Sequence, residues 1–255
     1  YLGCEVVPIN IDEDSFPGRP TEPVGSALME LSELVVDNGC DVGFALDPDG
    51  DRLAVVSEKG EILGEEYTLP LAEISAIEYL YSQKFSKTIV VNMSTSSLSD
   101  FVASKYGFRV IRSKVGEANV VDEMLKFNAF IGGEGNGGVI FPLINPARDS
   151  FVGMALILLL LAKSGKKVSE IFSLLPKLEM VKKKFEGNLE KEYIEKIIDD
   201  VSSEFGSYER NELDGVWFGF KSGWIHIRGS NTEPITRVIF EGTEEFVDFV
   251  SKRFS

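Results

Sequence analysis

The chain contains, at residues 42–56, the segment Val42-Gly-Phe-Ala-Leu46-Asp47-Pro48-Asp49-Gly50-Asp51-Arg52-Leu53-Ala-Val-Val56. Its two apolar runs predict buried strands, and the polar residues between them predict a short connecting loop. Pro48 and Gly50 bend this loop, so the side chains of Asp47, Asp49 and Asp51 can converge. Three close carboxylates repel one another unless a hard cation neutralises them. The segment therefore predicts a Mg²⁺ site, with Arg52 placed to reach a phosphate that also touches the metal.

The acidic loop also has two other interpretations. An acidic surface loop needs no metal at all, and this alternative stays open. A calcium-binding EF-hand loop would have a carboxylate at its twelfth position, where Glu58 falls. It also needs glycine at its sixth position and helices on both sides, whereas this chain has Arg52 there and strand-like flanks. The pattern therefore fits magnesium better than calcium.

Composition restricts the possible partners. The formal net charge of -15 over 255 residues argues against nucleic acid and anionic membranes. The longest apolar run, from Phe151 to Ala162, is too short to span a bilayer. Cys4 and Cys40 are the only cysteines, which predicts neither a disulfide framework nor a zinc site and favours a reducing, cytoplasmic location. Because the chain starts at Tyr1 instead of Met, we expect a fragment or a processed product.

Strand and helix signals alternate along most of the chain. A strand is expected from Cys4 to Ile11 and a helix from Val24 to Asp37, and strand–helix repeats restart at Thr88. After about Val181 the order changes to a strand, a helix, three strands and a final helix. We predict an α/β protein with two consecutive α/β domains, the first of them incomplete, followed by a small α+β domain. The expected domains are residues 1–86, 87–180 and 181–255.

A second loop is rich in glycine. Gly133, Gly135 and Gly138 satisfy the G-x-G-x-x-G spacing, but a strand follows them, whereas a dinucleotide fold needs a helix there. We therefore reject a nucleotide site. The glycines would instead let the backbone approach a ligand, while Glu134 and Asn136 present an acceptor and a donor to hydroxyl groups. A glycine-rich hairpin that binds nothing is the alternative.

A third loop, Arg228-Gly-Ser-Asn-Thr-Glu-Pro234, lies between the last two predicted strands, and Arg237 follows it. Two arginines, two hydroxyls, an amide and the N–H groups of a turn form an anion-binding set, with phosphate as the expected anion. An ordinary polar turn is the alternative. His226, the only histidine, lies on a strand and is interpreted as a packing residue, so a catalytic triad is unsupported.

Taken together and in this order, the three loops resemble those of the α-D-phosphohexomutases. The similarity extends over nearly the whole chain and includes Val115-Gly116 and Arg148-Asp149. The resemblance implies that Asp47, Asp49 and Asp51 hold Mg²⁺ and that Arg52 lies beside a phosphoserine. It also implies that sugar hydroxyls are bound by Glu134 and Asn136, and that the distal phosphate is bound by Arg228, Ser230, Asn231, Thr232 and Arg237.

The family resemblance implies a reaction as well as a site. Phosphohexomutases interconvert hexose 1-phosphates and hexose 6-phosphates through a phosphoserine and a bisphosphate intermediate. Their N-terminal domain carries a Ser-His-Asn segment with the phosphorylated serine, and no such segment occurs here. We therefore expect a chain that binds a phosphorylated hexose but cannot turn over without the missing N-terminal mutase domain. The alternative is a non-catalytic phosphosugar-binding or regulatory protein.

Several departures from the family pattern leave the sugar open. Many members have Ser and His in the second loop where this chain has Asn136 and Gly138. Bacterial forms place a lysine and a histidine near the positions of Met93 and Glu117. These differences put the choice between glucose and mannose in doubt, and the oligomeric state is equally open.

Overall fold

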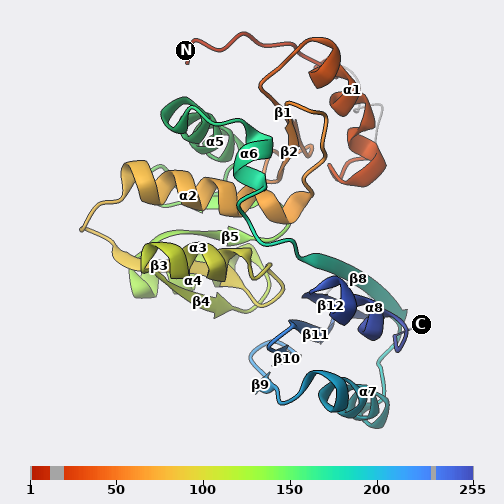
Figure 1. Cartoon of the computed structure of the whole chain (residues 1–255). Coiled ribbons are helices and arrows are strands. Elements are labelled where there is room, and N and C mark those ends of the chain that lie inside the picture. Colours follow the sequence, from red (N-terminus) through yellow and green to blue (C-terminus); the bar gives the residue numbers. More distant parts are fainter. Residues whose placement is uncertain (1, 12–19, 231–233, 255) are drawn as a thin grey trace.

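The structure is a computed structural model that describes residues 2–11, 20–230 and 234–254. It confirms the mixed α/β architecture: a two-stranded sheet, a five-stranded mixed sheet and a five-stranded antiparallel sheet follow one another along the chain (Figure 1). We call the corresponding parts the first unit (described residues up to 63), the middle unit (64–178) and the last unit (179–254).

The first unit is built around one hairpin. It contains η1 (Gly25–Leu28), α1 (Met29–Asp37), β1 (Val42–Leu46) and β2 (Leu53–Ser57). The two strands pair antiparallel with Leu46 opposite Leu53, so residues 47–52 form the connecting loop. This confirms the strand–loop–strand arrangement predicted for the acidic segment. Ala45 and Val56 pack against the apolar side of α1 in a small core.

The predicted strand from Cys4 to Ile11 is wrong. Described residues 2–11 form neither helix nor strand and are mostly exposed, although Ile9 packs against the first unit's core. Apolar alternation is present in this segment, but a strand also needs a neighbour that satisfies its backbone hydrogen bonds. Within the described ranges the sheet here consists of β1 and β2 alone, and neither pairs with residues 2–11.

The middle unit is a three-layer α/β/α arrangement. Its elements are η2 (Glu65–Tyr67), α2 (Thr68–Leu80), β3 (Ser86–Asn92), α3 (Leu98–Tyr106), β4 (Arg109–Ser113), α4 (Glu117–Phe127), β5 (Ala129–Glu134), β6 (Gly138–Phe141), β7 (Asn145–Arg148), α5 (Ser150–Ser164) and α6 (Val168–Phe172). The strand order is β4-β3-β5-β6-β7, with β3 parallel to both β4 and β5. Because these three strands are parallel, their carboxyl ends meet at one edge of the sheet.

Helices cover both faces of the middle sheet. Apolar side chains of α2, α3 and α5 share one large core with the sheet, and α4 packs on the opposite face through Val120 and Met124. The edge strand β7 was not predicted, because Pro146 disfavours a strand except at a sheet edge. Among the described residues, even the apolar α5 falls short of the length required to cross a membrane.

Helix α2 bears on the first domain boundary. It packs along α5 and over β5 and β6, all of the middle unit. The expected boundary after residue 86 would assign this helix to the first domain. The domain limits remain a proposal, and the packing of α2 favours a boundary ahead of Thr68.

The last unit is a separate α+β layer. It contains β8 (Glu179–Glu186), α7 (Lys191–Phe205), β9 (Glu209–Asn211), β10 (Val216–Phe220), β11 (Gly223–Gly229), β12 (Ile235–Gly242) and α8 (Glu244–Ser251). The strand order is β8-β12-β11-β10-β9. Both helices contribute to one core with the sheet, through residues such as Ile197 and Phe246. Figure 1 shows this unit, coloured from teal at β8 to blue at α8, beyond the segment that leads from α6 into β8.

Candidate functional site

The acidic loop between β1 and β2 brings its three aspartates together. One carboxylate oxygen from each of Asp47, Asp49 and Asp51 lies within 4.8 Å of the others. The loop folds over Asp47, whose Oδ1 accepts hydrogen bonds from the N–H groups of Asp51 and Arg52, both at 3.0 Å. Gly50 has a φ of 72°, a left-handed conformation that glycine adopts without strain. A cluster of carboxylate oxygens suits a hard divalent cation.

The surroundings affect these carboxyl groups differently. Burial raises the pKa of Asp51 to about 6, and the hydrogen bond with Asp47 acts in the same direction. Burial also opposes the charge of Asp47, but hydrogen bonds from the Arg52 N–H and with the neighbouring aspartates lower its pKa. In the part of the chain that the structure describes, Asp51 Oδ1 is buried and has no hydrogen-bond partner. A cation would neutralise such an oxygen, so the donor set fits the predicted metal.

Arg52 lies beside the aspartates and reaches toward Glu22. Its Nη1 is 3.0 Å from Glu22 Oε1, and its Nε is 3.6 Å from Asp47 Oδ2 and 3.7 Å from Asp51 Oδ1. Burial opposes its charge, but Glu22 and the aspartates raise the pKa of Arg52. The guanidinium therefore stays charged next to the metal loop. Its contact with a phosphate remains a prediction.

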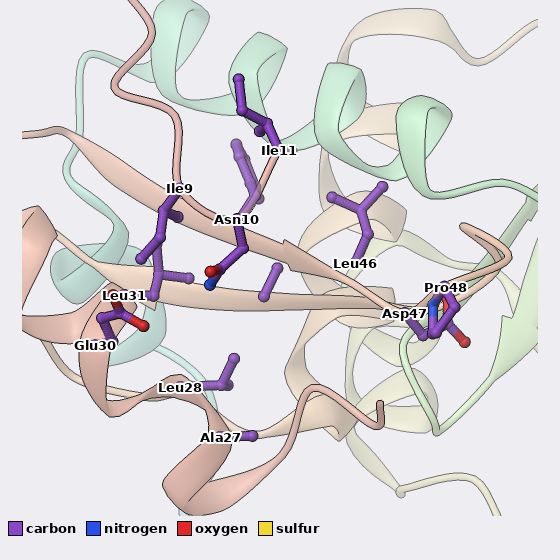
Figure 2. Close-up of a pocket in the computed structure, with 12 residues that line it drawn as sticks. Ile9, Asn10, Ile11, Ala27, Leu28, Glu30, Leu31, Leu46, Asp47 and Pro48 are labelled. Carbon is purple, nitrogen blue, oxygen red and sulfur yellow. The ribbon is translucent and has the colours of Figure 1, made fainter. Parts of the chain in front are cut away.

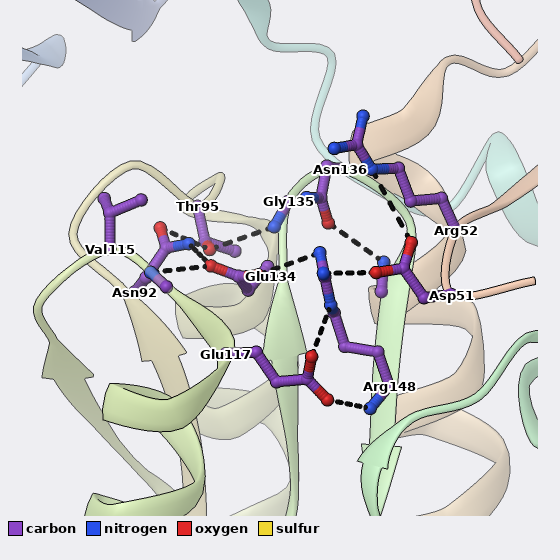
Figure 3. Close-up of polar contacts among 12 residues, drawn as sticks. Asp51, Arg52, Asn92, Thr95, Val115, Glu117, Glu134, Gly135, Asn136 and Arg148 are labelled. Atoms are coloured by element: carbon purple, nitrogen blue, oxygen red, sulfur yellow. Dashed lines mark hydrogen bonds and ion pairs between the residues drawn. The ribbon is translucent and has the colours of Figure 1, made fainter. Parts of the chain in front are cut away.

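Arg148, at the end of β7, connects the acidic loop to the middle unit (Figure 3). Its Nη2 pairs with Asp51 Oδ2, its Nη1 lies 3.0 Å from Glu134 Oε2, and its Nε lies 3.3 Å from Glu117 Oε2. The Arg148 side chain is 14% exposed. In the sequence, Arg148 was recognised only as part of a family motif and had no assigned role. Local spacing could not reveal this role, because its three acidic partners come from the acidic loop, the start of α4 and the end of β5.

Glu134, at the end of β5, is held by three donors from separate segments. Its Oε1 accepts hydrogen bonds from Asn92 Nδ2 at 2.7 Å and from the Gly116 N–H at 3.0 Å, and its Oε2 pairs with Arg148. Asn92 ends β3 and Gly116 precedes α4, so these donors lie at the carboxyl edge of the parallel strands. The sequence predicted a role for Glu134 without these partners. Its contact with a sugar hydroxyl remains a prediction.

The glycine-rich turn after Glu134 packs directly against the first unit. The Leu53 N–H donates to the carbonyl oxygen of Gly137 at 3.2 Å. Gly137 has a φ of 86°, and a Cβ atom there would overlap the Leu53 carbonyl oxygen. Asn136 Oδ1 accepts from the Gly138 N–H at 3.2 Å, which shapes the turn. The glycines therefore let two backbones approach closely, and the acidic and glycine-rich loops are held side by side.

The predicted phosphate loop lies at the end of β11 and the start of β12. Arg228 and Arg237 are cross-strand partners in this pair, and the Ser230 N–H donates to Ile235 O at 2.9 Å. Asn231 and Thr232 lie outside the described residues. Burial lowers the pKa of Arg228, and the nearby charge of Arg237 acts in the same direction. The charges of Asp214 and of Glu134 in the middle unit partly oppose this lowering. Arg228 is thus close enough to Glu134 for their charges to interact.

An apolar groove of about 290 Å³ runs along β1 and ends at the acidic loop. Figure 2 shows Ile9 and Leu31 at one end of the groove and Asp47 with Pro48 at the other. Phe44 and Leu46 of β1 also line it. The sequence analysis did not predict this groove.

Two family models match the chain. One, described as phosphoglucomutase/phosphomannomutase, alpha/beta/alpha domain II, matches residues 1–60, and the corresponding domain III model matches residues 73–178. A phosphoglucomutase/phosphomannomutase from Thermococcus kodakarensis is 36% identical over 245 residues, which cover 96% of this chain and 53% of the relative. A phosphoglucosamine/phosphogalactosamine mutase from Sulfurisphaera tokodaii is 34% identical, with coverages of 96% and 54%.

Solved structures show the same fold. The crystal structure of a phosphoglucomutase/phosphomannomutase family protein from Burkholderia thailandensis has a TM-score of 0.74 at 22% identity, and the match covers 93% of this chain and 51% of that one. The chain therefore spans about half the length of the curated relatives it matches.

Proposed function

Because this chain belongs to the phosphoglucomutase/phosphomannomutase family, we propose that it forms the metal-binding and sugar-binding part of a phosphohexomutase. The complete protein would interconvert a hexose 1-phosphate and a hexose 6-phosphate through a phosphoserine and a bisphosphate. No Ser-His-Asn segment occurs in the sequence. We propose that the phosphoserine comes from polypeptide outside these 255 residues and that this chain alone does not turn over.

The proposal rests on the charged groups that lie between the acidic loop and the loop from Arg228 to Pro234, which we call the arginine loop. Arg148 pairs with Asp51 on one side and with Glu134 on the other. Glu134 in turn acts on the charge of Arg228 in the last unit. The Val115 N–H, which precedes the Gly116 N–H bonded to Glu134, donates to Asp214 of the last unit, so the last unit meets the middle unit beside Glu134. Charged groups at both ends of this arrangement would suit a ligand with a phosphate at each end, which is the bisphosphate of the proposed reaction.

The residues of this chain would bind and orient the substrate. Arg228 and Arg237 would hold the phosphate remote from the reaction, with Ser230, Asn231 and Thr232 as further donors. Glu134 and Asn136 would bind sugar hydroxyls. Binding energy at the remote phosphate would place the reacting oxygen near Arg52, the proposed catalytic residue of this chain. Mg²⁺ held by Asp47, Asp49 and Asp51 would supply neutralisation of the charge that develops during phosphoryl transfer.

The groove along β1 supports the proposed partner, the N-terminal mutase domain. Most of its lining side chains are apolar and it ends at the acidic loop, so an apolar segment of the partner seated there would lie next to the proposed metal site. Cys4 and Cys40 are both free thiols, which supports the proposal of a reducing, cytoplasmic location.

The proposal is tested by binding to the purified chain. We expect calorimetric titration to show Mg²⁺ binding that Asp49→Asn weakens at least about tenfold, because one of three carboxylate ligands is lost. Asp49 is exposed, so this change leaves the core intact. Asp41→Asn, an exposed aspartate outside the cluster, is the matched control and should bind Mg²⁺ normally.

The sugar phosphate is tested in the same way. Glucose 6-phosphate should bind, and Arg228→Gln should weaken it about tenfold or more, because a charge-assisted contact is lost. Absence of both Mg²⁺ and glucose 6-phosphate binding in the unchanged protein would contradict the proposed function. Normal turnover of glucose 1-phosphate by this chain alone would contradict the proposed need for a separate serine.

A further inference from the structure

Strand β11 presents two different faces. Ile225 and Ile227 point into the core of the last unit. Because side chains alternate along a strand, Trp224, His226 and Arg228 share the opposite face. Two of the three make polar contacts: Trp224 Nε1 donates to Glu241 Oε2 at 2.8 Å, and His226 contacts Ser94, which follows β3. Burial lowers the pKa of Arg228, and the charge of Glu134 in the middle unit is one of the causes that oppose this lowering. This face therefore looks toward the middle unit.

His226 is fully buried and bridges two segments. Its Nε2 lies 2.6 Å from the backbone carbonyl oxygen of Asp214, and its Nδ1 lies 2.8 Å from Ser94 Oγ. A carbonyl oxygen can only accept, so Nε2 carries the ring proton. In the neutral ring Nδ1 is then the acceptor, and the Ser94 hydroxyl donates to it. The hydrogen bonds thus select one tautomer, and one of them joins the last unit to the end of β3.

A second contact adjoins the first. The backbone carbonyl of Asp214 accepts the hydrogen bond from His226 Nε2–H, and its carboxylate accepts another from the Val115 N–H at 2.8 Å. The next N–H along the chain, that of Gly116, donates to Glu134 Oε1. His226 and Asp214 therefore dock the last unit directly beside Glu134.

Other polar contacts lie near the connection between the two units. Lys182 Nζ is 2.6 Å from Glu65 Oε1 and 2.8 Å from Glu66 Oε1. Glu241 Oε2 also accepts from the Ser97 N–H at 2.8 Å. Lys182 and Glu241 line the same pocket as Leu178, where the chain passes into the last unit.

We propose that His226 is a positioning residue: its hydrogen bonds with Ser94 and Asp214 hold Arg228 at a set span from Glu134, for a ligand that must reach both. The span matters only if the proposed sugar-phosphate function holds. His226 and Arg228 lie two residues apart on one face of a strand, so fixing the first side chain places the second.

The charges around the ring agree with a neutral His226. Burial lowers its pKa, Asp214 opposes this, and the nearby guanidinium groups of Arg228 and Arg112 add to the lowering. A protonated ring would be a third cation beside two half-buried guanidinium groups, and its Nδ1 could no longer accept from Ser94. The two hydrogen bonds described above are therefore those formed at neutral pH.

Amide hydrogen exchange of Val115, followed by NMR on the whole chain at pH 7, tests the contact without any ligand. Ser94→Ala and His226→Gln should each speed this exchange about fivefold or more, which corresponds to the loss of one net hydrogen bond. Ser94→Thr keeps a hydroxyl and should retain protection. Ser97→Ala, three residues away, is the matched control, and the Gly116 amide is an internal one. Unchanged exchange of Val115 in both test variants overturns the proposal.

Ligand affinities then distinguish a positioning role of His226 from general damage to the arginine loop. Inorganic phosphate needs only the arginine loop, whereas glucose 6-phosphate needs both ends of the span. Ser94→Ala should therefore weaken glucose 6-phosphate about fivefold and leave inorganic phosphate within about twofold. Equal losses for both ligands, or no loss for either, overturn the positioning role. If the unchanged protein binds inorganic phosphate but not glucose 6-phosphate, the proposed function fails, and the Val115 exchange still decides whether the His226 contact exists.

Discussion

The two junctions between the units differ in kind. Leu53 and Val55 of the first unit belong to the same apolar core as α2, α5 and β5 of the middle unit. The last unit has its own core, and side-chain hydrogen bonds and ion pairs join it to the rest. A shared core excludes water and permits little relative motion, whereas a polar junction resembles a transient interface.

The difference between the two junctions shows which loops of the candidate site are held rigidly together. Backbone hydrogen bonds reinforce the first junction, from Leu53 N–H to Gly137 O and from Ser150 N–H to Gly50 O. The first and middle units therefore form one rigid body, which holds the acidic loop and the glycine-rich loop together. The arginine loop (Arg228 to Pro234) lies on the other side of the polar junction, where side-chain contacts such as that of His226 with Ser94 set the position of Arg228 relative to Glu134.

The largest expected effect concerns Glu73, buried on α2 within the rigid body. Burial is the main cause that raises its pKa from 4.5 to about 8. The folded protein then binds more protons than the unfolded chain between these values, so stability falls as pH rises through this interval. At pH 9, Glu73→Gln should raise the free energy of unfolding by about 4 kcal/mol, with little change at pH 4.5.

Denaturant unfolding at pH 4.5 and pH 9 checks this expectation. Glu33→Gln, at an exposed glutamate of α1, is the control and should be neutral at both pH values. If Glu73→Gln also raised the free energy of unfolding of the last unit, the last unit would not unfold independently of the rigid body.

The next effect compares equivalent core truncations. Leu53→Ala should destabilise the rigid body by about 3 kcal/mol, and Ile225→Ala should destabilise the last unit by a similar amount. Both side chains are fully buried. Differential scanning calorimetry should resolve two transitions, each lowered by only one of the variants. If both variants shift one common transition, the polar junction couples the units more tightly than the comparison implies.

The smallest effect concerns two helix caps. The Asp149 side chain accepts from the Val152 N–H at the start of α5, and Thr243 Oγ1 accepts from the Phe246 N–H at the start of α8. Asp149→Ala and Thr243→Ala should each cost about 1 kcal/mol. Thermal unfolding followed by circular dichroism should assign the first loss to the rigid body and the second to the last unit. A loss spread over both transitions would count against this division.

Much of the fold was predictable because its signals are local. The apolar runs around the acidic loop predicted β1 and β2, and the change of order after Val181 predicted a separate last unit. The prediction of a strand at residues 4–11 was wrong, because none of the described strands pairs with this segment. The edge strand β7 was not predicted, because Pro146 within it disfavours a strand assignment.

The candidate site divided in the same way. Asp47, Asp49 and Asp51 are close in sequence, so their convergence could be predicted. Arg148 and His226 could not be assigned a role, because their partners Asp51, Glu134 and Ser94 lie far from them along the chain.

The sequence by itself determined most of the strands and helices and the polar residues that the three loops carry, because short-range spacing fixes which side chains share a face or a turn. Only the tertiary structure decided that Arg148 joins the acidic loop to Glu134 and that His226 docks the last unit. These contacts depend on the close packing of distant segments, and a pattern of neighbouring residues carries no information about which distant donor fills a buried acceptor.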